Sequence, residues 1–248
     1  MNDTPANAGA TVPKLDETFL QLTVGYDDLI KLAEVHAGRI SPGDAPTRLR
    51  QEGLVTSTGV HPTAASLVEV AVGPARSIVV ERFDGATLKP LFIGWMPDGR
   101  ATTSTPDAEG AVVVTATELG LLRDQLRQWL AIFDREVVDD RDTVGTNTTV
   151  IDAAMTLDGV DPSGDAALDP ILEGWRLAWR ATGNWAERDV DASVTVVDAG
   201  AQGWYRVEHA PRTGNEEVEV SLVPLTLEEV VAALGDVVTG RRSQVADD

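Results

Sequence analysis

Three histidines are the side chains of this sequence best suited to acid–base or metal chemistry, because imidazole titrates near neutral pH and binds transition metals. They are His36, His61 and His209, and none has a histidine or glutamate partner at metal-ligand spacing. The apolar spacing of residues 26–37 places His36 on the buried face of a predicted helix, which favours a packing role. His61 precedes Pro62 in a predicted turn and is expected to cap a helix or to be exposed. The histidines therefore predict no catalytic or metal site.

A run of aspartates at 158–170 could instead bind calcium, which prefers carboxylate oxygens. An EF-hand loop needs a glycine at its sixth position and a glutamate at its twelfth. If the loop starts at Asp161, Gly164 falls at the fourth position and Leu172 at the twelfth. The spacing fails, and the segment is predicted to be a solvated acidic loop that ends in a helix cap.

The other common signatures of catalysis are missing from the sequence. No Walker loop, no Gly-x-Gly-x-x-Gly pattern and no Gly-x-Ser-x-Gly elbow occurs, and there is no cysteine for a nucleophile or a thiolate metal site. We therefore predict no catalytic residues, no cofactor, no metal and a protein that is not an enzyme. An enzyme of unrecognised type remains an alternative, which a cleft gathering two or more of the histidines and carboxylates would favour.

Tryptophan is the aromatic residue that dominates the chain, with six copies among twelve aromatic residues. Several of these lie in the second half and can be read as large core residues. They can also be read as an apolar patch for a protein partner, because tryptophan and tyrosine dominate interface hot spots. The candidate partner-binding residues are Trp175, Trp179, Trp185, Trp204 and Tyr205.

The segment 48–74 has the outline of a winged helix: a short basic helix, a turn and a helix that begins with proline. Its second helix carries Glu69 as its only charge and has no arginine, lysine, asparagine or glutamine to read base edges. The whole chain has a net charge of −20, which repels a polyanion. Nucleic-acid binding is therefore disfavoured, and an acidic regulator with a degenerate winged helix is kept as an alternative.

Composition favours a soluble intracellular protein. Apolar residues make up 43% of the 248 residues, which is enough for a real core. The N-terminus lacks the pattern of a secretory signal, and no apolar run approaches the roughly 18–20 residues that span a bilayer. Residues 1–15 and 241–248 read as tails. We expect a cytoplasmic protein without membrane insertion.

The first half predicts a helix at 26–37, the helix pair just described, an antiparallel meander and a helix that begins at Thr117. Asp84-Gly85 and Pro97-Asp98-Gly99 supply the hairpin turns. The strands of the meander are predicted at 76–83, 88–96, 100–105 and 111–116.

The second half predicts two helices, three strands and a closing helix. The first helix starts with Thr149 and Asp152 in capping-box spacing, and the closing helix starts with Thr226 and Glu229 in the same spacing. The helices are predicted at 149–157 and 169–181, and the strands at 193–199, 203–209 and 217–223.

The two halves resemble one another in the order of their elements, with Thr117 corresponding to Thr226 at the start of the last helix of each half. Half-repeats are predicted at about 16–138 and 146–240. A lone meander leaves an open edge that pairing can close. The sequence therefore predicts a single α+β domain with a quasi-twofold repeat, in which helices flank a central antiparallel sheet.

Three stretches together resemble the EspG family, the cytosolic chaperones of actinobacterial ESX (type VII) secretion systems. They are "RLRQEGLVTSTGVHPTAASLVEVAVGP" (48–74), "SVTVVDAGAQGWYRVEH" (193–209) and "VEVSLVPLTLEEVVAALGDVV" (218–238). Asp198, Gly203, Tyr205 and Pro224 stand where that family has its strand end, turn, aromatic residue and proline. Trp204 stands where the family would be expected to have arginine.

The resemblance implies a quasi-twofold fold whose central antiparallel sheet is flanked by helical bundles. It implies no catalysis. It also implies that the chain binds the apolar tip of a PPE protein in a PE–PPE heterodimer, or a related WXG-type substrate, and keeps it soluble for secretion. The sheet and the C-terminal helical part would form the binding surface. The oligomeric state stays open.

Overall fold

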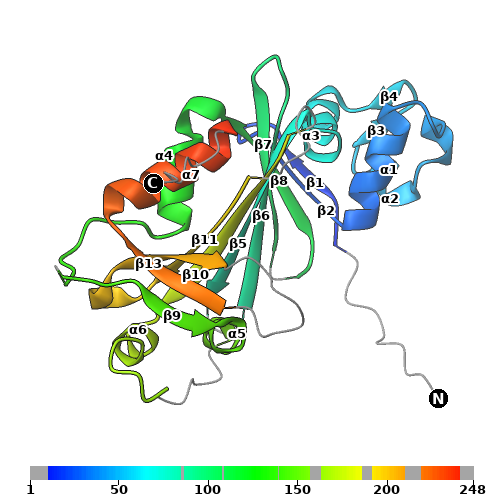
Figure 1. Cartoon of the computed structure of the whole chain (residues 1–248). Coiled ribbons are helices and arrows are strands. Elements are labelled where there is room, and N and C mark those ends of the chain that lie inside the picture. Colours follow the sequence, from blue (N-terminus) through cyan, green and yellow to red (C-terminus); the bar gives the residue numbers. More distant parts are fainter. Residues whose placement is uncertain are drawn as a thin grey trace, which may run out of the picture. The chain divides into compact units, whose positions relative to one another are not determined.

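The computed structural model describes residues 11–84, 87–107, 109–138, 140–156, 163–185, 192–209 and 219–240. The fold is α+β, as predicted, and its centre is an antiparallel sheet of 11 strands (Figure 1). The strand order is β1-β2-β8-β7-β6-β5-β10-β11-β12-β13-β9. After β1, the order has the same form from either end. Each half runs inward from an outer strand (β2 or β9) to the last strand of its meander (β8 or β13) and then back through the meander to its first strand (β5 or β10). The quasi-twofold repeat appears in this order.

The chain divides into two compact units. The N-terminal unit ends at Ser77 and resumes over Leu91–Leu122, and the C-terminal unit contains Ile78–Pro90 and the described residues from Arg123 onward. These boundaries follow packing and do not test the predicted half-repeats, which stay a prediction. None of the described helices is long and apolar enough to cross a membrane.

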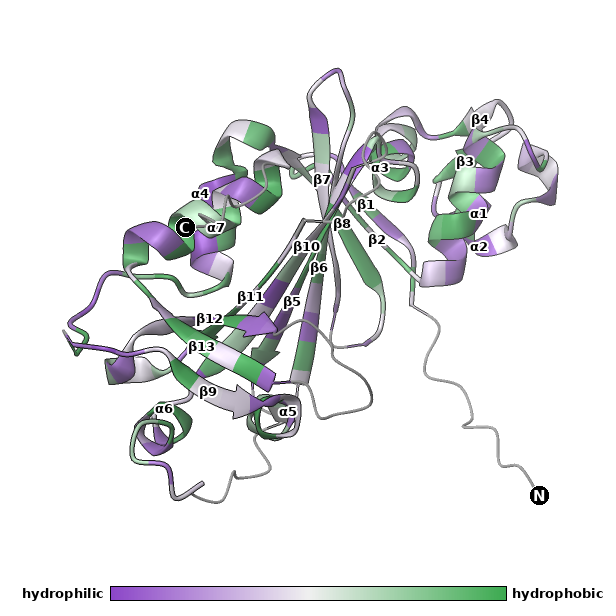
Figure 2. Ribbon diagram, viewed as in Figure 1, coloured by the Kyte–Doolittle hydropathy of each residue, from purple (hydrophilic) through white to green (hydrophobic). Residues whose placement is uncertain are grey.

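The N-terminal unit packs helices on the outer strands of its part of the sheet. Its elements are β1 Lys14–Asp16, β2 Gln21–Val24, α1 Tyr26–His36, the 3₁₀ turn η1 Pro42–Asp44, α2 Thr47–Gln51, β3 Val55–Thr56, β4 Gly59–Val60, α3 Pro62–Val72, β7 Arg100–Pro106 and β8 Val112–Glu118. The strands β5 Arg76–Asp84 and β6 Thr87–Trp95 are shared with the other unit. In Figure 2, hydrophobic and hydrophilic bands alternate along these long strands, as expected where side chains point to opposite faces.

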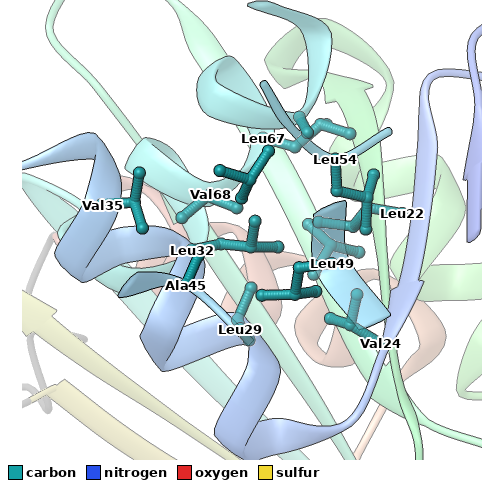
Figure 3. Close-up of a cluster of buried hydrophobic side chains, with 13 residues drawn as sticks. Leu22, Val24, Leu29, Leu32, Val35, Ala45, Leu49, Leu54, Leu67 and Val68 are labelled. Atoms are coloured by element: carbon teal, nitrogen blue, oxygen red, sulfur yellow. The ribbon is translucent and has the colours of Figure 1, made fainter. Parts of the chain in front are cut away.

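Apolar side chains from α1, α2 and α3 fill the core of this unit against β2 and β8. Leu32, Leu49 and Leu67 point toward one another in Figure 3, and Leu22 and Val24 approach them from the sheet. The helix spacing explains this, because Leu29 and Leu32 lie on one face of α1 at i and i+3. The helix pair that suggested a DNA-binding element is thus part of the core.

The C-terminal unit contains most of α4 Leu119–Trp129, together with β9 Val144–Asn147, α5 Thr148–Thr156, α6 Asp169–Glu173, β10 Leu177–Trp185, β11 Ala192–Asp198, the 3₁₀ turn η2 Gly200–Gln202, β12 Trp204–His209, β13 Glu219–Leu225 and α7 Leu227–Thr239. In Figure 1, α4 and α7 lie next to each other, while α5 and α6 lie near β9.

One predicted element is wrong. The segment 169–181 is predicted to be a single helix. The helix ends at Glu173, and the chain continues as β10 from Leu177. Gly174 lies against the backbone carbonyl of Ala199, where any Cβ would overlap, so the chain turns there toward β11. Leu177, Ala178 and Trp179 are all buried. A strand covered on both faces has no period-2 pattern, and its apolar run resembles a helix.

Two capping predictions have different outcomes. The box at Thr226 and Glu229 is confirmed, with the side chain of each residue accepting from the backbone N–H of the other. At α5, Asn147 caps the helix instead of Thr149, because its Oδ1 accepts from Val150 N at 3.0 Å. The predicted N-terminal tail also reached too far, since Lys14 and Leu15 belong to β1.

Candidate functional site

A shallow hollow of the C-terminal unit lies beside α7 and has a volume of about 350 Å³. It is lined by Arg123 of α4 and, from α7, by Glu228, Val231, Ala232, Gly235, Asp236 and Thr239. Its lining includes two small residues at i and i+3, Ala232 and Gly235, and a Cβ added at Gly235 would meet nothing within 4 Å. Such a surface allows the backbone of a second helix to approach closely.

Helix α7 presents this surface because its opposite face is buried. Val230, Leu234 and Val237 are almost fully buried and hold the helix on the sheet. Thr226 fixes its first turn, and its backbone N–H donates to the Glu229 carboxylate, which lowers the pKa of Glu229. Gly240 ends the helix in the left-handed conformation at φ 66°.

A buried ion pair holds the segment between α4 and β9 in place. The Arg135 guanidinium donates to both Asp198 oxygens at 2.9 and 2.5 Å, and the Asp198 side chain is only 5% exposed. The N–H of Gly200 also donates to Asp198 at 2.9 Å. Arg135 lies over the Trp204 ring, with its Cζ 4.0 Å from the ring centroid. The carboxylate is therefore fully engaged.

A second arginine from the same segment bridges the η2 turn and the ends of two strands. Arg141 donates to the carbonyl oxygens of Gln202 and Trp204 at 3.3 Å and to that of Leu225 at 3.1 Å. Gly203 has φ 87°, and any side chain there would overlap the Arg141 guanidinium. The backbone conformation thus favours glycine at this position, and any other residue would displace the Arg141 guanidinium. We call Arg135, Arg141, Asp198, Gly203, Trp204 and Tyr205 the Asp198 cluster.

The candidate aromatic residues do not form one exposed patch. Trp179 is fully buried, and Trp204 and Tyr205 are each 2% exposed. Burial raises the pKa of the Tyr205 hydroxyl, and Arg141 nearby opposes that rise. Trp175 is half-buried and packs beside a core cluster of this unit, while the side chain of Trp185 lies outside the described residues. Whether any of the five contacts a partner stays untested, but three offer almost no surface.

The histidines lie on separate elements. His36 is exposed in the last turn of α1, contrary to the predicted packing role, because Val35 takes the buried position. His61 is half-buried before α3, with Nε2 3.9 Å from Glu17 Oε1. His209 and Asp152 border a hollow of about 110 Å³ under α5. This hollow brings one histidine and one carboxylate together, but it is smaller than the ~300–1,000 Å³ of typical ligand sites.

Metal and DNA candidates gain no support from the described residues. No group of three or more histidine, aspartate or glutamate side chains there could hold a metal ion. Of the predicted acidic loop, residues 158–162 lie outside the described part, while Asp169 accepts from the N–H and hydroxyl of Ser163 at 2.7 Å. On α3, Glu69 binds Arg100 at 2.6 Å instead of facing a polyanion.

Comparison with protein-family models finds no match, and neither does comparison with curated protein sequences. Among solved structures, the chain is similar to the Mycobacterium tuberculosis type VII secretion system chaperone EspG5, determined in complex with the PE25–PPE41 dimer. The two share 12% sequence identity at a TM-score of 0.55, over 88% of this chain and 95% of that chain. This chain has an EspG-like fold.

Within this EspG-like fold, the four residues that carried the resemblance gather in one place. Asp198 ends β11, Gly203 precedes β12, and Tyr205 lies opposite Pro224 in the β12–β13 register. Trp204, the departure from the expected arginine, stacks under Arg135. The residues that carry the resemblance therefore lie in or beside the buried Asp198 cluster, where their role is structural.

Sequence reasoning missed Arg135 and Arg141. The available signal was that Arg141 is the one basic residue among nine acidic ones in 139–173. A single basic residue in an acidic segment suggests that its side chain has a specific partner inside the protein. Its partners are backbone carbonyls 61 to 84 positions away, which no local pattern reveals.

Proposed function

We propose that this chain is a non-catalytic cytoplasmic chaperone that binds a helical substrate of a type VII secretion system, PPE-like or WXG-type, and keeps it soluble. The observation that carries the proposal is the EspG-like fold combined with the open hollow on α7. A substrate helix fits this surface because small residues line it and the buried face of α7 keeps it rigid. The net charge of −20 keeps the loaded chaperone soluble and away from nucleic acid.

The proposed contact site is the hollow on α7 and not the buried tryptophans. Glu228 and Asp236 of α7 and Arg123 of α4 are the charged residues that line the hollow. Partner helices with apolar or small residues facing Ala232 and Gly235 would be preferred. Charged groups at the rim would tune the rate of association more than the affinity.

Co-expression with PPE-like and WXG-type proteins encoded beside the gene tests this function. The expected result is a stable complex with one of them in size-exclusion chromatography. Ala232→Leu, which grows into the hollow, should weaken that complex by at least roughly tenfold, because a filled groove excludes the partner helix. Ala153→Leu, an equal change at an exposed position of α5, is the matched control.

Two outcomes count against the proposal. If each candidate substrate stays insoluble or elutes separately from the wild-type chain, the chaperone function is wrong. If a complex forms and Ala232→Leu and Ala153→Leu bind it equally well, the function stands and the hollow is not the contact site.

A further inference from the structure

Strand β1 ends the sheet in the N-terminal unit. In the strand order of the described residues it has β2 on one side and no strand on the other. The backbone N–H and C=O groups on its outer side are therefore available for pairing with another strand. Edge strands are often protected by being short and by carrying lysine, and β1 has three residues and begins with Lys14.

The sequence of β1, Lys14-Leu15-Asp16, is complementary to itself when two copies pair antiparallel. With Leu15 opposite Leu15 of a second copy, each Lys14 faces the second copy's Asp16. Lys14 is exposed and makes no ion pair with any described residue. Asp16 uses Oδ1 to accept from the N–H groups of Thr18 and Phe19, so Oδ2 can still take a cation.

Large apolar side chains flank this short strand. Val12 is 68% exposed, and at the turn into β2 Phe19 is 71% exposed. Leu20 is also exposed and has φ 48°, a conformation that costs a leucine about 1 kcal/mol or more. β1 ends at Asp16 and residues 17–20 form a turn, so in the register centred on Leu15 the exposed Val12 and Phe19 flank the paired segment. Pairing would bury apolar surface that the single chain leaves in water.

We propose that β1 pairs antiparallel with β1 of a second copy of this chain, in the register centred on Leu15. The charges favour one register of self-pairing, because a shift of the register takes Lys14 and Asp16 away from their opposite charges. A second copy always carries the matching pair of charges at the required spacing, whereas another strand matches only if it has a basic and an acidic residue two positions apart. The interface is small and the two copies share a like net charge, so the dimer is weak and reversible. The inference does not depend on the chaperone function.

Analytical ultracentrifugation of the full chain over a range of concentrations tests the proposal. The wild-type chain should show a reversible monomer–dimer equilibrium at high micromolar concentration. Lys14→Asp places carboxylates opposite each other twice in the interface and should weaken the dimer by at least roughly tenfold. The matched control is Arg39→Asp, which makes the same change in charge at an exposed position away from β1 and should leave the equilibrium unchanged.

A disulfide test fixes the register, because the chain has no cysteine of its own. In Leu15→Cys the two thiols would face each other at the Cα separation of about 4.5–5.5 Å that a disulfide accepts. Mild oxidation should give a covalent dimer. Tyr26→Cys places a more exposed thiol on α1 and should give little.

The proposal is overturned by any of three results. These are a wild-type chain that stays monomeric at several hundred micromolar, a dimer that Lys14→Asp and Arg39→Asp affect equally, and Tyr26→Cys crosslinking as fast as Leu15→Cys. Circular dichroism of each variant shows that it is folded before these results are read.

Discussion

The two units are stabilised internally by different kinds of interaction. In the N-terminal unit, leucines and valines from α1, α2 and α3 meet on β2 and β8, and the arginines of its ion pairs, Arg48 and Arg100, are half-exposed even though Asp28, the partner of Arg48, is buried. The C-terminal unit also has an apolar core, but its connecting segment is held by two arginines inside the Asp198 cluster. Two halves with matching strand order can thus be stabilised by different interactions. The arginine contacts of the Asp198 cluster are more specific than apolar packing.

Asp198→Ala should show the largest effect, because it leaves the Arg135 charge partly buried without its carboxylate. Breaking one side of such a pair costs roughly 3–5 kcal/mol. Urea denaturation measures the loss in the free energy of unfolding. Asp98→Ala, which removes a more exposed carboxylate from Arg100, should cost less than about 1 kcal/mol. Equal losses would remove the distinction between the two units.

Leu32→Ala should come next, at about 2–4 kcal/mol, because Leu32 is fully buried between helices that cannot collapse onto the space. The same denaturation experiment measures it, with the half-exposed Leu121→Ala as the control near zero. A loss below about 1 kcal/mol would mean that the apolar cluster is loosely packed.

Gly235→Ala should have the opposite effect to the two substitutions above, because it should stabilise the C-terminal unit. The added Cβ meets no atom within 4 Å, and alanine is favoured over glycine inside a helix by about 1 kcal/mol. A rise in melting temperature is the readout. No gain, or a loss, would mean that the space beside α7 is filled.

The pH dependence should be the smallest effect. The Glu229 pKa is lowered from its ordinary value of 4.5, first by the Thr226 N–H. Its stabilisation is therefore complete above pH 4.5 and is lost as the pH falls through the lower folded pKa. Glu69 behaves alike in the N-terminal unit, through Arg100. Glu229→Gln should flatten the acid limb of the stability curve, and an unchanged limb would contradict this assignment.

The parts of the fold that local chemistry controls could be predicted from the sequence. The capping box at Thr226 and Glu229 predicts the start of α7. The turn at Gly99, which has φ 89°, predicts the β6–β7 hairpin. The spacing of Leu29 and Leu32 places α1 on the core.

The parts set by distant contacts could not be predicted. β10 lost its strand pattern because both of its faces are covered, and His36 was expected to pack inside because helical spacing alone does not show where a helix leaves the core. The hollow on α7 depends on Arg123 of another helix. The burial of Trp179, Trp204 and Tyr205 could not be predicted either, because a large apolar side chain is equally suited to a core and to an interface.

Pro224 gives β13 a position without a backbone N–H, opposite Tyr205. Arg141 supplies side-chain donors to the carbonyls of the next pair in the register, Trp204 and Leu225. A guanidinium thus caps carbonyl oxygens at this end of the sheet, and a side chain at residue 203 would displace it. One side chain therefore ties two strand ends together, and release of Arg141 would leave both carbonyls without this donor at once.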